Sequence, residues 1–336
     1  MKQVGFSLLI LLFASHPAGA QSPADTPLSV TGFFDVQATR LPESDNMFSL
    51  GPFEVDLELL YSDRVSMSAA VVVEDGAAEA GPAFVDIHLF QRDGAAHSPR
   101  GALFALPGLH VQLGSFDVPF GVDYQFYASP DRLTISAPLS TDFLEYFDGG
   151  WTDIGVRAYT SHPWYNFTAY TVNGNAEGYA AGGRIGITPF RSFEADGEDI
   201  PVVELGVSGN RDVDDGSEEE FTLFGADLGC NLHGFHLLAE YVASDNAADD
   251  ITQESSYAQV NHPLPLVLAI GYARFDTFTA TLPGSDDLRT DRVTVGIRRD
   301  FFDAVILKLE YQRYLEDECE LADGADHLAA QVVATF

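Results

Sequence analysis

Apolar and polar residues alternate at every second position through most of this 336-residue chain, and almost no helical periodicity interrupts the pattern. Within residues 304–314, for example, Lys308, Glu310 and Gln312 share one face of a predicted strand and Leu309 lies on the other. Three polar side chains on one face need water there, whereas the apolar face must be covered by a second sheet or by lipid. The chain is therefore all-β, and its strands have one wet and one dry face.

Turn residues divide the alternating segments into pieces of about 8 to 12 residues, which is the length of strands that cross an outer membrane. We predict sixteen strands, at residues 28–40, 52–62, 64–74, 83–93, 109–116, 152–160, 165–173, 179–188, 200–210, 220–229, 234–243, 253–261, 266–276, 291–299, 303–314 and 326–336. An open sheet edge in lipid would leave backbone groups unpaired at a cost of several kcal/mol each. We therefore expect a closed antiparallel transmembrane β-barrel of about 16 strands.

The predicted connections fall into a mostly short set and a longer, acidic set, as in bacterial barrels with short periplasmic turns and long outer loops. Two connections, 94–108 and 189–199, are long for the short set. Trp151 and Trp164 flank the sixth strand and are expected in the aromatic girdles at the two interfaces. An even strand number places both termini in the periplasm.

The two ends of the chain indicate export to the outer membrane of a Gram-negative bacterium. Residues 1–20 have the pattern of a signal peptide, with Lys2 before an apolar run and the cleavage sequence Ala18-Gly19-Ala20. The mature domain is then 21–336. Its last strand has apolar residues at every second position and ends on Phe336, which resembles the C-terminal signature of bacterial outer-membrane proteins. That resemblance implies that Phe336 closes the barrel and is the assembly signal.

The chain is strongly acidic, with 51 Asp and Glu against 17 Lys and Arg and a formal net charge of −34. Nucleic-acid binding is not expected, because it depends on cations that neutralise phosphates. The acidic connections instead predict a solvated outer rim next to outer-membrane lipid and lipopolysaccharide, where divalent cations could bind weakly. Cys230 and Cys319 are expected at opposite barrel ends, too far apart to form a disulfide within one chain.

Three segments resemble porins of the phosphate-selective porin O and P family. The first is Gly114-Ser115-Phe116-Asp117-Val118-Pro119-Phe120-Gly121, and it is followed by Gly150-Trp151-Thr152-Asp153-Ile154-Gly155-Val156-Arg157 and by Tyr170-Thr171-Val172-Asn173-Gly174. The resemblance implies a 16-stranded barrel, assembled as a homotrimer, whose long third loop folds inward as a constriction. Here that loop would be 117–150.

The expected pore differs from that family, whose phosphate-selective members line the pore with arginine and lysine. In this chain Lys308 is the one lysine after residue 20. The acidic side of the predicted constriction consists of Asp117, Asp123, Asp131, Asp142, Glu145 and Asp148. The basic side of the lumen consists of Arg132, Arg157, Arg184, Arg298 and Lys308. Carboxylates at a constriction favour cations, although these groups could equally be lumen salt bridges that stiffen the wall.

No motif indicates catalysis or a cofactor. The histidines lack the close spacing of a zinc site, so we expect no metal, and a Gly-x-Ser-x-Gly sequence is absent. Two functions are left open. The first is a water-filled channel through which small hydrophilic solutes or ions diffuse passively, with a preference for cations. The second is a non-conducting or plugged barrel with a structural or adhesion role that depends on its acidic outer loops.

Overall fold

The structure is a computed structural model. It describes residues 28–317 and 326–336, except 41–47, 63, 75, 92–107, 145, 148–149, 163, 175–177, 194–198, 214–220, 248, 285–286 and 302–303. The expected signal peptide and cleavage site, at residues 1–20, lie outside the described residues.

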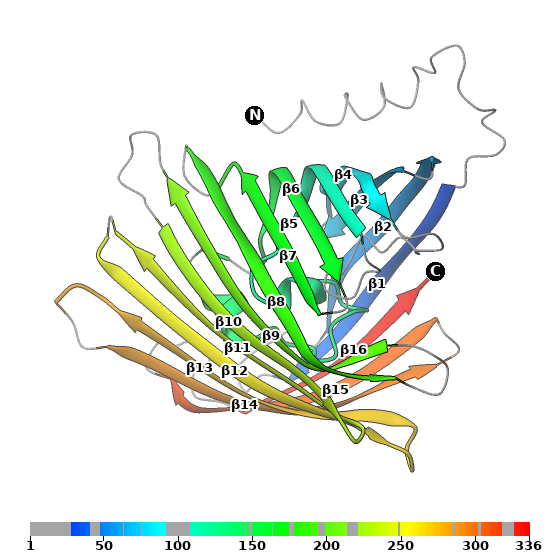
Figure 1. Ribbon diagram of the computed structural model, residues 1–336. Helices are drawn as coiled ribbons and strands as arrows, with labels where there is room; N and C mark the ends of the chain where they lie inside the picture. Colours follow the sequence, from blue (N-terminus) through cyan, green and yellow to red (C-terminus); the bar gives the residue numbers. More distant parts are fainter. Residues whose placement is uncertain are drawn as a thin grey trace.

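Sixteen antiparallel strands form one closed barrel in which each strand pairs with its neighbours in the sequence and the first pairs with the last (Figure 1). The strands are β1 (Leu28–Arg40), β2 (Phe48–Ser62), β3 (Val65–Glu74), β4 (Ala77–Gln91), β5 (Gly108–Asp117), β6 (Thr152–His162), β7 (Tyr165–Val172), β8 (Tyr179–Phe193), β9 (Asp199–Val213), β10 (Phe221–Leu232), β11 (Phe235–Asn246), β12 (Ile251–Leu264), β13 (Ala269–Thr281), β14 (Leu288–Phe301), β15 (Val305–Asp317) and β16 (His327–Thr335). The predicted fold class and strand number are confirmed.

The alternation in the sequence becomes the difference between the inside and the outside of the barrel. On β15, Lys308 and Glu310 are each 1% exposed, whereas Leu307 and Leu309 are 39% and 51% exposed. Outward apolar side chains recur on most strands, as a transmembrane barrel requires for contact with lipid. The polar face therefore lines the lumen.

The barrel closes where the two ends of the described chain meet. Strand β16 pairs with β1 over eight residue pairs, from Phe33↔Thr335 to Arg40↔Leu328. Gly32 and Phe336 extend this ladder, since each backbone N–H donates to the other residue's carbonyl, at 3.1 and 3.0 Å. The first strand thus begins, and the last strand ends, at the same rim.

At that rim the connections between strands include several tight turns, such as residues 233–234 between β10 and β11. His233 and Gly234 both have positive φ angles, as a two-residue hairpin turn requires. Two expected loops were wrong. Residues 75–82 are mostly strand, because β4 begins at Ala77, and much of 189–199 belongs to β8 and β9, whose pairing is irregular between Ile187 and Arg191.

Two smaller expectations also need correction. Trp151 is 4% exposed and packs inside the barrel, so it is not part of an interfacial girdle, whereas Trp164 is 58% exposed. The predicted strands put Cys230 in the turn between the tenth and eleventh strands, whereas it lies within β10 opposite Leu237, close to the rim of the termini. Cys319 lies outside the described residues, so the absence of a disulfide stays a prediction.

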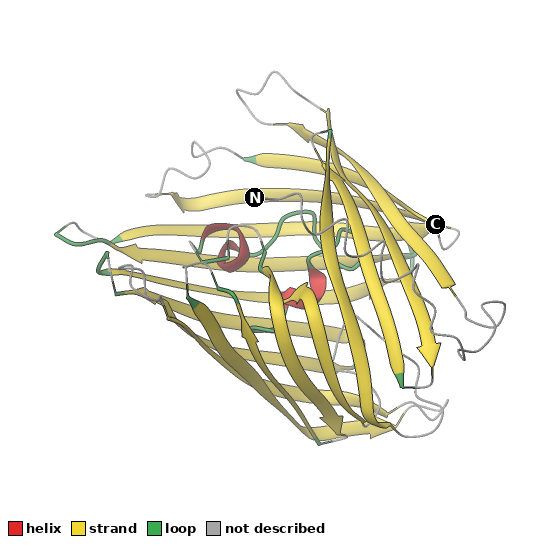
Figure 2. Cartoon of the chain, turned by 90° about the horizontal axis from the view of Figure 1, so that it is seen from above, coloured by secondary structure: helices red, strands yellow, loops and turns green. Residues whose placement is uncertain are grey.

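The helical segments that bear on the lumen are η3 (Asp123–Phe126) and α2 (Leu139–Phe143), both in the connection between β5 and β6. Figure 2 shows them on the inner side of the strand wall. No helix among the described residues is long and apolar enough to cross a membrane.

Candidate functional site: the loop-filled lumen

The connection 118–151, called here the lumen loop, turns into the barrel directly after β5. Pro119 and Phe120 lead to Gly121, whose φ angle of +66° is one that side-chain-bearing residues rarely adopt. The Gly121 N–H donates to Ser208 Oγ on β9 at 3.0 Å, and a Cβ atom at Gly121 would collide with the Glu240 carboxylate on β11. Glycine is therefore required where the loop first touches the facing wall.

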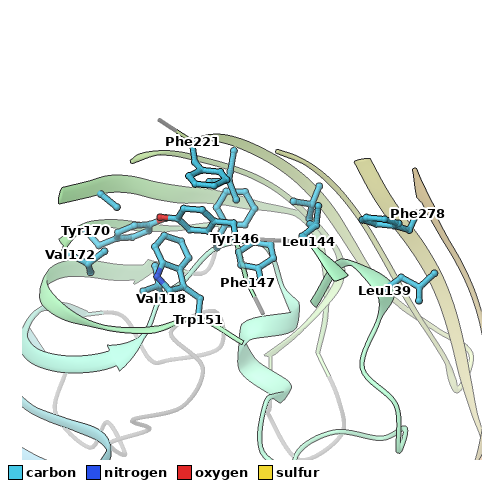
Figure 3. Packing of buried hydrophobic residues seen from close by; sticks show 14 of the residues in the cluster. Val118, Leu139, Leu144, Tyr146, Phe147, Trp151, Tyr170, Val172, Phe221 and Phe278 are labelled. Carbon is cyan, nitrogen blue, oxygen red and sulfur yellow. The ribbon is translucent and has the colours of Figure 1, made fainter. Parts of the chain in front are cut away.

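An aromatic cluster anchors the two ends of the lumen loop (Figure 3). The Tyr146 ring packs edge-on against Trp151, with 4.7 Å between centroids, and against Phe221 of β10 at 5.2 Å. The Trp151 ring in turn meets Tyr170 of β7 at 5.8 Å. Buried aromatic pairs of this kind stabilise by about 0.5–1.5 kcal/mol beyond their area.

Basic side chains of the barrel wall donate to backbone carbonyls in the middle of the lumen loop. Lys308 Nζ lies 2.7 Å from the Ser129 carbonyl oxygen and 3.2 Å from that of Thr134. Arg298 Nη1 donates to the Pro130 carbonyl at 2.7 Å. Arg274 and Arg292 donate to the carbonyls of residues 136 and 137. These basic side chains therefore bind the lumen loop and are not free charges in a water-filled lumen.

Acidic side chains of the wall accept hydrogen bonds from loop N–H groups, which completes the attachment. Glu310 takes the N–H of Ile135 at 2.8 Å and of Ser136 at 3.1 Å. Asp276 takes the N–H of Leu139 at 3.3 Å and Glu240 that of Val122 at 3.2 Å. Hydrogen bonds to charged groups contribute about 1.5–3 kcal/mol each, so the loop is fixed across the lumen.

Among the predicted constriction residues, Asp123 pairs with Arg132 of the same loop. The Arg132 Nη2 lies 3.0 Å from Asp123 Oδ2, both side chains are almost fully buried, and Thr141 Oγ1 donates to the same oxygen at 2.6 Å. Asp142 lies 4.0 Å from Arg292 of β14. Burial raises the pKa of the Asp142 carboxyl above its ordinary value, although Arg292 acts in the opposite direction.

The other predicted acidic residues are spread along the lumen loop. Asp117 is the last residue of β5 and accepts from Thr152 Oγ1 at 2.6 Å. Asp131 is exposed at a turn beside the loop's carbonyl contacts. Glu145 and Asp148 lie outside the described residues.

The predicted basic residues on β6 and β8 have local partners. Arg184 of β8 donates to Glu204 on the adjacent strand β9 and to Asp227 on β10, the next strand along, and forms a buried ion-pair group within the wall. Arg157 stacks over the rings of Phe116 and Tyr159, about 5 Å from each centroid. The structure thus connects wall cations to loop carbonyls and to neighbouring carboxylates, instead of setting an acidic loop against a separate basic wall.

A cavity of about 370 Å³ lies between the lumen loop and the inner faces of β11 to β14. Its charged lining includes Asp123, Asp131, Asp300, Arg132, Arg274 and Arg298, and its polar lining includes Gln259 and Asn261. Its volume is within the range of pockets that admit a small molecule.

The wall residues Arg274, Arg292, Asp276 and Glu240 were missed at the sequence level. Each lies on the polar face of a predicted or extended strand, so the alternation marked them as lumen residues. It could not distinguish them from the many other polar residues on the same face, because their partners are loop backbone groups more than a hundred residues away.

A closed 16-stranded antiparallel barrel with an apolar outside and a loop folded into a polar lumen is the fold of an outer-membrane porin. Solved structures agree. The trimer form of OmpT, an outer-membrane protein of Vibrio cholerae, is similar with a TM-score of 0.66 and 10% identity, over 93% of this chain and 99% of that one.

Two further solved structures are similar over almost their whole length. The anion-selective porin from Comamonas acidovorans has a TM-score of 0.62 at 12% identity, over 93% of this chain and 100% of that one. The outer-membrane channel DcaP of Acinetobacter baumannii has a TM-score of 0.59 at 12% identity, over 95% and 99%. At these identities the likeness shows the fold alone. No protein-family model matches the sequence, and no curated protein matches it either.

Proposed function

We propose that this protein is a passive outer-membrane channel for small hydrophilic solutes or ions. The observation that carries the proposal is the charged cavity of about 370 Å³ between the lumen loop and the wall, inside a closed barrel. A cavity of this size beside an inward loop, with charged groups in its lining, suits the entry of small hydrated solutes. Two similar structures are described as a porin and as a channel, which supports the same role here. The role is transport without catalysis.

We propose further that the channel prefers cations. The support is the net charge of −34, since a strongly acidic protein raises the local concentration of cations. Within the cavity itself Asp123, Asp131 and Asp300 are balanced by three arginines. The preference is therefore assigned to the acidic surface of the chain more than to the cavity wall.

Conductance measurements test this function directly. Purified protein in planar bilayers should give discrete conductance steps, and a salt gradient at neutral pH should give the reversal potential of a cation-preferring pore. Lowering the pH through about 4, where unperturbed Asp and Glu protonate, should weaken the preference. The Asp142 carboxyl should protonate above the ordinary range of an aspartate, because burial raises its pKa. A reversal potential of the opposite sign at neutral pH would reject cation preference.

A second candidate function has its own structural support. The lumen loop is bonded to walls on several sides, and Lys308, Glu310 and Arg292 are almost completely covered. This packing suits a plugged barrel with a structural or adhesion role at its acidic rim. Failure to observe conductance steps from folded protein would favour that role.

The remaining aspects of the proposal concern assembly. We place both termini in the periplasm, the long connections outside next to lipopolysaccharide, and the chain in a homotrimer, which the trimer form of the similar Vibrio cholerae protein supports. Sedimentation of the detergent-solubilised protein should give three chains per particle.

A further inference from the structure

Three polar side chains converge on the inner wall at the rim of the termini, away from the lumen loop's anchors. They are Asp86 and His88 of β4 and His110 of β5, and all three are buried. Asp86 and His88 are two residues apart and so share a face, and His88 is directly opposite His110 in the strand pairing. A pair of adjacent strands therefore presents two imidazoles and one carboxylate to a common point.

The donor atoms lie at nearly the spacing of metal ligands. His110 Nδ1 is 3.6 Å and His88 Nε2 is 4.0 Å from Asp86 Oδ1, and all three atoms lie within 4.8 Å of one another. Ligands of a tetrahedral Zn²⁺, at about 2.0–2.1 Å from the ion, are roughly 3.3 Å apart. Small side-chain rotations would bring the three atoms onto one ion.

The facing polar atoms of Asp86 and His110 are poorly satisfied by the protein alone. Asp86 Oδ1 and His110 Nδ1 face each other beyond hydrogen-bond distance, and neither has a hydrogen-bond partner among the described residues. Gln112, opposite Asp86 on β5, is fully buried, and neither polar atom of its amide has a partner within the described chain. Each such buried group costs about 1–3 kcal/mol, which a bound cation with its water would offset.

A neighbouring tyrosine holds the ligands in place. Tyr159 of β6 donates its hydroxyl to Asp86 Oδ2, which leaves Oδ1 directed at the histidines. The Tyr159 ring also stacks on His110, with 4.7 Å between centroids and 10° between planes. Outer contacts of this kind orient metal ligands in proteins.

We propose that Asp86, His88 and His110 form a site for a divalent transition-metal ion that links β4 to β5. Two imidazoles and one carboxylate select zinc-like ions over Mg²⁺ and Ca²⁺, which take all-oxygen sites. Three protein ligands leave a position for water. All three ligands lie on β4 and β5 and none on the lumen loop, so the proposal does not depend on whether the barrel conducts.

Zinc binding by the folded full-length protein tests the proposal. After chelator treatment, the protein is equilibrated with Zn²⁺ in excess Mg²⁺, which occupies weak carboxylate sites on the rim, and bound zinc is measured by calorimetry and elemental analysis. We expect one zinc ion per chain. The variants His88→Gln, His110→Gln and Asp86→Asn should each weaken binding at least tenfold, whereas the strand-borne control His327→Gln should bind like the unaltered protein.

Co²⁺ supplies a measurement on the unaltered chain in case the variants fold poorly. Bound Co²⁺ should give the intense visible absorption of a four- or five-coordinate site, and zinc should displace it. Failure of the unaltered protein to retain zinc, or equal retention by His110→Gln and His327→Gln, would overturn the proposal.

Discussion

Arg274 shows how one residue can decide the state of the lumen. Its guanidinium donates to Thr134 Oγ1, to the hydroxyl and carbonyl oxygens of Ser136 and to the Ala137 carbonyl. It also forms an ion pair with Asp276 at 3.0 Å. A planar group with five donors suits this task, because a single ammonium could not reach so many acceptors in fixed directions. Arg274 is therefore the strongest single attachment of the lumen loop.

We expect Arg274→Gln to lower the free energy of unfolding by about 3 kcal/mol, since it leaves buried acceptors without their charged donor. The lumen loop should also become accessible to protease. Urea unfolding and limited proteolysis of the refolded protein measure both effects. The control is Arg289→Gln on the neighbouring β14, because Arg289 is half exposed at the rim and its ion pairs are worth little. Equal stability of the two variants would show that the loop is held by its apolar cluster instead.

The lumen loop is the element on which conduction depends. It is bonded to β9 at Gly121, to β11 at Val122 and to β13 to β15 at residues 129–139, and it packs into the aromatic cluster near Tyr146 and Trp151. Since its backbone polar groups are paired with wall side chains, the loop can stay inside the barrel without the cost of unpaired groups. Displacing the loop at Gly121, where it first contacts the facing wall, should therefore change the cavity beside the loop.

We expect Gly121→Ala to increase single-channel conductance, because its Cβ would displace the start of the loop from Glu240. The control is Gly76→Ala in the turn before β4. Gly76 has a similar positive φ angle of 79°, but a Cβ there would touch nothing within 4 Å. Both variants carry the backbone cost of about 1–2 kcal/mol for a left-handed alanine, so a difference in conductance reports the displacement. Identical conductance would mean that this contact does not limit the passage.

For the whole molecule, the closing of the barrel is the decisive step, because an unclosed edge cannot be tolerated in lipid. The Phe336 ring packs on Gly32, where a Cβ would collide with it, and stacks at 6.1 Å from Phe53 of β2. The terminal aromatic thus contacts the two strands that follow it around the barrel.

We expect Phe336→Ser to reduce the folded, membrane-inserted fraction several-fold, whereas Phe336→Tyr should assemble like the unaltered protein. Both variants keep the backbone hydrogen bonds to Gly32, so the difference isolates the aromatic ring. Heat-modifiable migration of the protein from outer-membrane fractions measures the folded share. Normal assembly of the serine variant would remove Phe336 from its proposed role as assembly signal.

The sequence alone determined the strands, because side-chain alternation has the same period as the strand and is read locally. The barrel, as opposed to a sandwich of two sheets, was predicted from the signal-peptide pattern and the last strand. Strand β1 was predicted at its observed bounds, Leu28–Arg40, and the lumen-facing positions of Arg184 and Lys308 were predicted by the same rule. The predicted ends of strands were wrong where turn-forming residues continue the strand pairing. An example is β4, which begins at Ala77 and not at residue 83.

Only the tertiary structure decided which lumen groups meet. Asp123 binds Arg132 beside it and not a facing wall, and Lys308 binds loop carbonyls some 175 residues away in the chain. The cluster of Asp86, His88 and His110 likewise could not be predicted from the spacing of these residues in the sequence, because it depends on the register of β4 against β5. Alternation assigns a side chain to a face, but pairing depends on register, on barrel closure and on the path of the lumen loop, and these are set by the fold as a whole.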